Sequence, residues 1–270
     1  MIGELEMKAK KFLATLAMAG ILAGSFGGGI VAEAADKSTI HFDSATRQAD
    51  PEFTELFDYF STQEVPSLGK LDNRTRYMAI LATLLGCQGV DEFKSVLNVA
   101  LDDGLSPIET KEIVYQATAY LGIGRVKPFL TATNEVMTAK NIKLPLVPQS
   151  TTTRENRREK GTAKQVELFG DGMRDFWQKS DINYMLAANC FGDYYTRTGL
   201  SNKDRELITF CYIAAQGGCE MQLAAHTAAN IAVGNDAELL TNIVTEIQPY
   251  IGYPRSLNAL AIVKRVSSKE

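Results

Sequence analysis

The chain has 270 residues, of which 45% are hydrophobic and 22% are charged, an ordinary composition for a globular protein. Its formal net charge is -4 and no Lys/Arg run with interleaved aromatic residues occurs, so nucleic-acid-binding classes are excluded. The length allows one large domain or two small ones. With two histidines and no close acidic cluster, we predict neither a dedicated metal site nor a bound cofactor.

The N-terminal segment 1–34 has the features of a secretory signal peptide. Lys8, Lys10 and Lys11 precede the apolar stretch FLATLAMAGILAGSFGGGIV, and the small-x-small sequence AEA follows at 32–34. The alternative is a retained membrane anchor, because the stretch approaches the ~20 residues that span a bilayer. Its glycines and the AEA site favour cleavage. We therefore predict an exported protein, periplasmic or extracellular, without stable membrane insertion after processing.

Two motifs recur in the same order and at a nearly constant offset, which indicates an internal duplication. YLGIGR at 120–125 recurs as YIGYPR at 250–255. LDNRTR at 71–76 matches LSNKDR at 200–205, an offset shorter by one position. Repetition at a fixed period predicts two copies of one structural unit of roughly 110 residues.

The sequence between the copies defines their expected boundaries. LPLVPQSTTT at 144–153 carries two prolines and is typical of a linker. We assign 39–143 to the first unit and 154–270 to the second.

Each unit is predicted to be helical. In the second copy, SNKD at 201–204 is a capping box ahead of the periodic run RELITFCYIAAQ. After a Gly-Gly break, a second helix is expected from about Cys219 to Val233, and a third ends near Pro249. PRSLNALAIVKRV supplies a fourth, and the first copy shows parallel segments. Because alternating strand patterns are absent, we predict an all-α, duplicated fold.

The second copy carries, in this order, Arg205-Glu206, His226, Gly234, YIGYP at 250–254 and NAL at 258–260. This order of motifs resembles the carboxymuconolactone decarboxylase family, which includes alkylhydroperoxidase D. The resemblance spans roughly 70–140 and 165–265 and implies a tandem antiparallel helical bundle that assembles as trimers or hexamers. We accordingly expect a homo-oligomer, a trimer of two-unit chains, that acts on a small-molecule substrate.

The second unit contains the candidate catalytic residues. Cys219, Gln222 and His226 have the three- and four-residue spacing that places side chains on one helical face. Glu206 lies on the preceding helix, and a carboxylate beside an imidazole forms a proton-transfer pair. Cys219 follows Gly-Gly at a helix N-terminus, which would favour the thiolate. The alternative is a core histidine beside a buried cysteine; the family pattern, with functional Glu and His at these two positions, favours a catalytic site.

One departure from the family pattern concerns the thiols. Alkylhydroperoxidase D-like members carry Cys-x-x-Cys-x-x-x-His, whereas here Gln222 occupies the position of the second cysteine. A disulfide between those two positions is therefore impossible. A dithiol peroxidase cycle would need Cys190 or Cys211 to resolve Cys219, and Cys190 is the candidate partner.

The first unit lacks the candidate catalytic residues of the second. At the repeat offsets, Tyr77 stands where the second unit has Glu206, and Val96 stands where it has His226. We therefore expect the first unit to be a degenerate, structural half.

Three functions remain open from the sequence. The first is acid–base catalysis by Glu206 and His226 on a lactone or keto acid, for which Arg205 and Arg255 are available anion anchors, although the resemblance gives Arg205 a structural role as readily. The second is a thiol-dependent, peroxiredoxin-type hydroperoxide reductase that uses Cys219, with antioxidant activity. The third is a non-catalytic oligomeric binding or scaffold protein.

Overall fold

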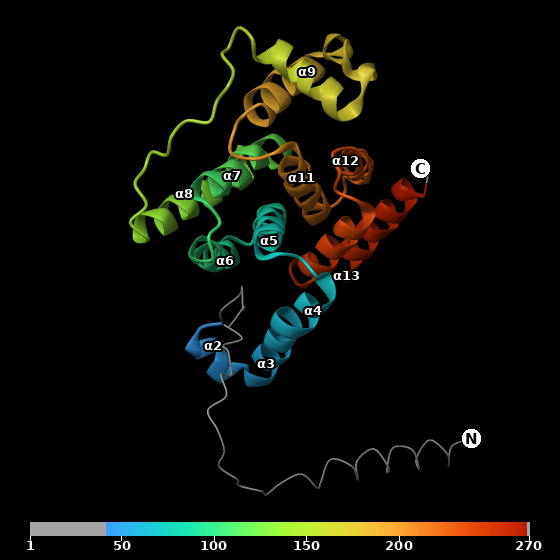
Figure 1. The fold of residues 1–270 in the computed structure, drawn as a ribbon. Helices are drawn as coiled ribbons and strands as arrows, with labels where there is room; N and C mark the ends of the chain where they lie inside the picture. The colour runs from blue at the N-terminus through green and yellow to red at the C-terminus, as the bar shows by residue number, and fades with distance from the viewer. Residues whose placement is uncertain (1–41, 269–270) are drawn as a thin grey trace, which may run out of the picture. The chain divides into compact units, whose positions relative to one another are not determined.

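The computed structural model describes residues 42–268, and the predicted signal peptide lies outside this range. Throughout residues 42–268 the regular secondary structure is helical and no strand occurs, as the all-α prediction requires (Figure 1). No helix in the same range is long and apolar enough to cross a bilayer.

The first half of the molecule runs from α2 to α8. Asp72 caps α5 by accepting a hydrogen bond from the Thr75 amide, and Ser106 and Glu109 form a capping box that begins α7. Its elements are α2 (Ser44–Ala49), α3 (Pro51–Tyr59), the π-helix η1 (Phe60–Glu64), α4 (Val65–Gly69), α5 (Asn73–Cys87), α6 (Val90–Asp102), α7 (Pro107–Leu121) and α8 (Ile123–Ala139).

The second half runs from α9 to α13. Ser201 and Asp204 form the capping box that the SNKD sequence predicts. Its elements are α9 (Arg157–Phe169), the 3-10 turns η2 (Asp171–Met173) and η3 (Phe176–Lys179), α10 (Asp181–Met185), the π-helix η4 (Leu186–Tyr195), α11 (Asn202–Gln216), α12 (Glu220–Ala232) and α13 (Ala237–Ser267).

The third helix of the second copy ends at Gly252, close to its expected end near Pro249. Pro249 lies inside α13, and the helical backbone is broken only at Gly252, where φ is 74°. Proline removes one hydrogen bond but does not end this helix, because the buried side chains of Ile247 and Ile251 hold it against the core. Glycine adopts the left-handed conformation of the break without steric strain.

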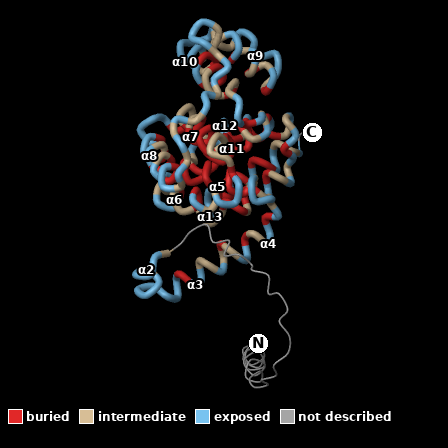
Figure 2. Tube along the Cα trace, turned by 60° about the vertical axis from the view of Figure 1, so that its left-hand side comes forward, coloured by how far each residue is buried: buried red, intermediate tan, exposed pale blue. Residues whose placement is uncertain are grey.

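The two halves share one hydrophobic core, centred on the contact between α5 and α11. Figure 2 shows that the buried residues concentrate in these central helices, whereas α2 and α3 are mostly exposed. Gly86 permits this close approach, since a Cβ at that position would lie 2.7 Å from the Tyr212 carbonyl oxygen. The helices therefore pack backbone to backbone where the halves meet.

Equivalent arginines join the halves symmetrically. Arg76 of α5 donates to Glu246 of α13 at 2.5 Å, and both side chains are buried. Arg205 of α11, the last residue of LSNKDR as Arg76 is of LDNRTR, donates to Gln116 of α7 at 2.7 Å. Gln116 and Glu246 each lie four positions before the tyrosine of the second repeated motif. In each half, therefore, the arginine that ends the repeated motif bonds to the equivalent position in the other half.

A tight glycine contact places η4 against α9. A Cβ on Gly161 would lie 1.9 Å from the Ala187 carbonyl oxygen, and one on Gly192 would lie 2.2 Å from the Arg157 carbonyl oxygen. Only glycine fits at either position. This contact sets the position of η4, which carries Cys190 and Tyr195 into a second, smaller apolar cluster.

Candidate active site

Glu206 and His226 meet between α11 and α12. The Nδ1 atom of His226 lies 2.7 Å from Oε2 of Glu206; the carboxylate is fully buried and the histidine side chain is 10% exposed. Asn230 holds the two helices in register, because its side-chain amide donates to the carbonyl oxygens of both Glu206 and His226. The sequence spacing and the two hydrogen bonds from Asn230 together position Glu206 and His226.

The pairing determines which imidazole nitrogen can exchange protons. With Glu206 ionised, its carboxylate can only accept hydrogen bonds, and Nδ1 then carries the proton that faces it. Nε2 has no hydrogen-bond partner among residues 42–268, and the ring is partly exposed. Nε2 is therefore the atom available to take a proton from a bound molecule or give one to it.

Glu206 also has an unused acceptor. Its Oε1 atom is buried and has no hydrogen-bond partner in the described part of the chain. Buried polar atoms are nearly always paired, so Oε1 has the capacity to accept a hydrogen bond from a bound molecule or water.

Aromatic rings from both halves enclose the imidazole. Tyr120, at the end of α7, and Phe169, at the end of α9, contact His226 edge-on, with ring centroids 5.5 Å and 5.4 Å from it. The Tyr120 hydroxyl is 2.8 Å from the hydroxyl of Tyr195, which is 2.8 Å from that of Thr209. Burial raises the pKa of both tyrosines well above 10, so their hydroxyls stay protonated.

Sequence reasoning missed Tyr120 as a site residue. The signal that could have found it is its place at the start of the repeated YLGIGR motif. What the motif does not reveal is that this tyrosine of the first half lies against the histidine of the second.

Cys190 lies in the same cluster and is held as a thiol. Its Sγ donates to the Tyr120 hydroxyl at 3.8 Å. Burial, together with the nearby charge of Glu206, raises the pKa of Cys190 to about 12, although the Tyr120 contact opposes this rise. A neutral thiol is a weak nucleophile, so Cys190 is poorly prepared to start or resolve a disulfide.

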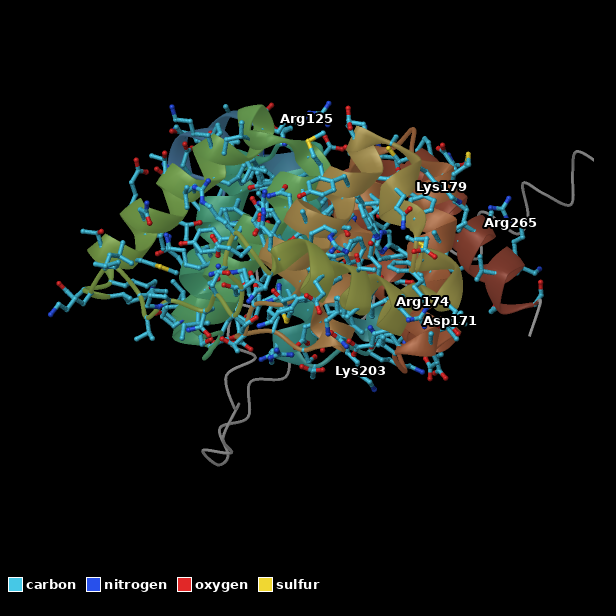
Figure 3. The ribbon with its side chains drawn as sticks, turned by 90° about the horizontal axis from the view of Figure 1, so that it is seen from above. Arg125, Asp171, Arg174, Lys179, Lys203 and Arg265 are labelled. Atoms are coloured by element: carbon cyan, nitrogen blue, oxygen red, sulfur yellow. The ribbon has the colours of Figure 1, made fainter. Side chains whose placement is uncertain are left out.

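Cys219 occupies a different, small cleft. It is the N-cap residue of α12, and the side-chain amide of Gln216 donates to its Sγ at 3.4 Å. The Gln216 carbonyl in turn accepts from Arg125, labelled in Figure 3, at 3.3 Å. Arg255 lines the same cleft, whose volume is about 20 Å³. A helix N-terminus and a guanidinium near one sulfur both attract negative charge.

Of the predicted stripe of Cys219, Gln222 and His226, only the last two residues lie within the helix. Cys219 precedes α12 with a non-helical backbone (φ -130°, ψ 41°), so helical spacing starts only at the next residue. Gln222 is exposed to solvent, whereas His226 is buried. All four cysteines are free thiols in the structure, and none is paired with another.

Arg205 has a structural position. Its guanidinium is buried and donates to Glu112 at 3.1 Å and to Gln116, both on α7. It joins the two halves and is not available to anchor a substrate carboxylate. At the positions equivalent to the acid–base pair, the first half has Tyr77, bonded to Asp103 at 2.5 Å, and the fully buried Val96.

Comparison with known proteins supports the same fold. The structure is similar to that of a Burkholderia xenovorans LB400 protein described as a "putative gamma-carboxymuconolactone decarboxylase subunit", with a TM-score of 0.51 and 19% sequence identity over 84% of this chain and 90% of that one. No curated protein matches the chain by sequence. The model of the carboxymuconolactone decarboxylase family matches residues 51–135 and 181–265, so the chain belongs to this family and contains two tandem copies of its domain.

Proposed function

We propose that this protein is an enzyme that uses Glu206 and His226 as an acid–base pair on a small lactone or keto acid. The observation that carries the proposal is the buried contact of 2.7 Å between Glu206 Oε2 and His226 Nδ1. Glu206 fixes the tautomer and stabilises the imidazolium, as a carboxylate does for other catalytic histidines.

The chemistry that fits this pair is decarboxylation next to an electron-accepting carbonyl. The bond between the carboxylate carbon and the substrate breaks, CO2 leaves, and the electron pair moves into the carbonyl system. The imidazolium form of His226 then gives its Nε2 proton to the substrate carbon, and the imidazole regains a proton from water. Hydroxyl donors lie beside the ring, since Tyr120 contacts it and bonds to Tyr195. Such donors stabilise developing oxyanion charge where water is excluded.

The direct test measures CO2 release by the purified protein from a panel of carboxylated lactones and β-keto acids. Glu206→Gln is nearly isosteric, and His226→Asn keeps an N–H near the Nδ1 position but lacks Nε2. Each is expected to lower kcat by about 10²- to 10⁴-fold, the usual contribution of a general acid or base. Tyr77→Phe, at the equivalent position of the first half, is the matched control and should keep full activity. Equal turnover by wild type and His226→Asn would refute the proposal.

A second candidate is thiol-dependent hydroperoxide reduction by Cys219, which the surroundings of its sulfur favour. The Gln216 amide, the N-terminus of α12 and Arg255 all lie near this thiol. The thiolate would attack the peroxide O–O bond, releasing an alcohol and forming a sulfenic acid. An added dithiol would reduce this acid to thiol and water and become a disulfide itself.

Peroxide consumption in the presence of a dithiol separates the two functions. If the second candidate holds, Cys219→Ser abolishes turnover, while Cys190→Ser, whose thiol is buried, retains it. If the acid–base proposal holds alone, wild type and Cys219→Ser consume peroxide at the same background rate, and Cys219→Ser keeps its activity on lactones or keto acids.

A further inference from the structure

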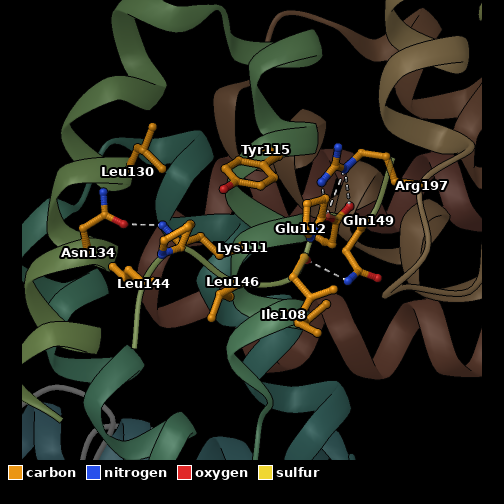
Figure 4. Close-up of a pocket in the computed structure, with 13 residues that line it drawn as sticks. Ile108, Lys111, Glu112, Tyr115, Leu130, Asn134, Leu144, Leu146, Gln149 and Arg197 are labelled. Atoms are coloured by element: carbon orange, nitrogen blue, oxygen red, sulfur yellow. Dashed lines mark hydrogen bonds and ion pairs between the residues drawn. The ribbon is translucent and has the colours of Figure 1, made fainter. Parts of the chain in front are cut away.

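A cavity lies on the N-terminal part of α7, away from the acid–base pair and from the small cleft at Cys219. It has a volume of about 540 Å³ and is enclosed by α7, α8 and the extended segment 144–149 (Figure 4). A volume of this size matches the range of small-molecule pockets, about 300–1,000 Å³. Leu130, Leu144 and Leu146 supply apolar wall, and Tyr115 lies between Lys111 and Arg197.

Lys111 is buried without an acidic partner. Only 6% of the residue is exposed, and its Nζ bonds to the neutral side-chain oxygen of Asn134. Within residues 42–268 no carboxylate forms an ion pair with it. Burial of a charged group without a counter-charge is costly, and here it lowers the pKa of the lysine.

The other charges around the cavity do not supply that counter-charge. Glu112, 1% exposed, is the acid nearest in sequence and already binds two cations. Arg197 pairs with it in a forked contact at 2.9–3.0 Å, and Arg205 donates to it at 3.1 Å. Among residues 42–268, Glu112 is the only acid that lines the cavity, and its charge is already shared by two arginines.

The aromatic ring of Tyr115 joins the two cations that face the cavity. Lys111 Nζ lies 5.9 Å from the ring centroid, and the guanidinium carbon of Arg197 lies 5.3 Å from it. These cation–π contacts replace part of the lost hydration, but they cannot neutralise the charge. An anion bound in the cavity would neutralise it.

From this excess of buried positive charge we infer that the cavity binds a small organic carboxylate. Its charged end would lie between Lys111 and Arg197, and its apolar part would pack against Tyr115, Leu130 and Leu146. This site is distinct from the acid–base pair, which contacts the opposite end of α7 through Tyr120.

The test is calorimetric titration of the purified protein with succinate, glutarate and benzoate, with succinamide and benzamide as uncharged controls. Wild type should bind at least one carboxylate and neither amide. Lys111→Met keeps the length and apolar stem of the side chain and should weaken binding tenfold or more, while Lys111→Arg should retain it. Because Lys111→Met removes an uncompensated buried charge, it should unfold at the same temperature as wild type or higher.

Two further variants locate the bound carboxylate. Leu146→Trp fills the cavity without altering a charge and should abolish binding. His226→Asn should leave binding unchanged, so failure of the acid–base proposal and failure of this one are separate results. Absence of carboxylate binding to wild type would overturn the inference, as would binding that is lost in His226→Asn and retained in Lys111→Met.

Discussion

Tyr120 of the first half packs its ring edge-on against His226 of the second half, with the ring centroids 5.5 Å apart. The candidate site is therefore completed by a residue from the half that lacks an acid–base pair. Tyr250 occupies the equivalent position in the second half, as the first residue of YIGYPR. The duplication has kept both tyrosines, and the first-half copy packs against His226.

Removal of the Tyr120 hydroxyl should affect the site more than removal of its counterpart. Tyr120→Phe keeps the ring contact with His226 but loses the hydrogen bonds to Tyr195 and Cys190. We expect a loss of about 1–3 kcal/mol in unfolding free energy, the usual cost of leaving buried hydrogen-bond partners unsatisfied, and a lower kcat. Tyr250→Phe is the control in the kinetic assay. An unchanged kcat in Tyr120→Phe would show that this hydroxyl has no part in the reaction.

The buried Arg76–Glu246 pair should be essential for joining the halves. Arg76→Ala leaves Glu246 buried without a counter-charge, because both side chains are at most 4% exposed. Loss of one partner of a buried ion pair lowers the free energy of unfolding by about 3–5 kcal/mol. Urea denaturation monitored by circular dichroism measures this loss.

Replacement of both partners provides the control for that experiment. Arg76→Met with Glu246→Leu removes both charges and should recover most of the lost stability. If the double variant were as unstable as Arg76→Ala, the loss would arise from packing and not from the unpaired charge.

The crossing of α9 and η4 should tolerate no side chain. Gly161→Ala would place a methyl group 1.9 Å from the Ala187 carbonyl oxygen, and backbone must move to relieve the clash. We expect destabilisation of at least about 1–3 kcal/mol, the cost of overpacking. The melting temperature measures it. Gly124→Ala, in α8 with no atom within 4 Å of the new Cβ, should be neutral or stabilising by up to about 1 kcal/mol.

Acid should weaken the contact that Arg74 makes between the halves. Arg74 donates to Asp204 at 2.9 Å and to Glu109 at 2.8 Å. Burial opposes their ionisation, but hydrogen bonds from Arg74 and from the capping serines outweigh it and lower the pKa of Asp204 below 3.8 and that of Glu109 below 4.5. In this range the unfolded chain binds protons before the folded one. The stabilisation is therefore complete above about pH 5 and is lost as the pH falls through the lowered pKa values.

Thermal unfolding between about pH 6 and pH 3 tests this dependence. The melting temperature of wild type should fall with pH, and that of Arg74→Met should fall less steeply, because the two acids then lose the cation that lowers their pKa. Identical slopes for the two proteins would contradict the assignment.

Local signals made much of the fold predictable. Capping at Ser201, the Gly-Gly break and the apolar periodicity all act within a few residues of the structure they specify, so α11 and α12 begin and end near their predicted bounds. Pro249 lies three residues before the break at Gly252 and does not itself end the helix. Its local tendency to end a helix is overcome by distant side chains that hold α13 on the core.

The sequence by itself determined the helical class, the duplication and the position of Glu206 and His226 on successive helices, since these follow from spacing and motif order. Only the tertiary structure decided that Tyr120 closes over His226, that Arg205 joins the halves and that Lys111 faces a cavity. These contacts join residues far apart in the chain. They depend on which helix faces meet when α5 and α11 pack, and no local pattern specifies that choice.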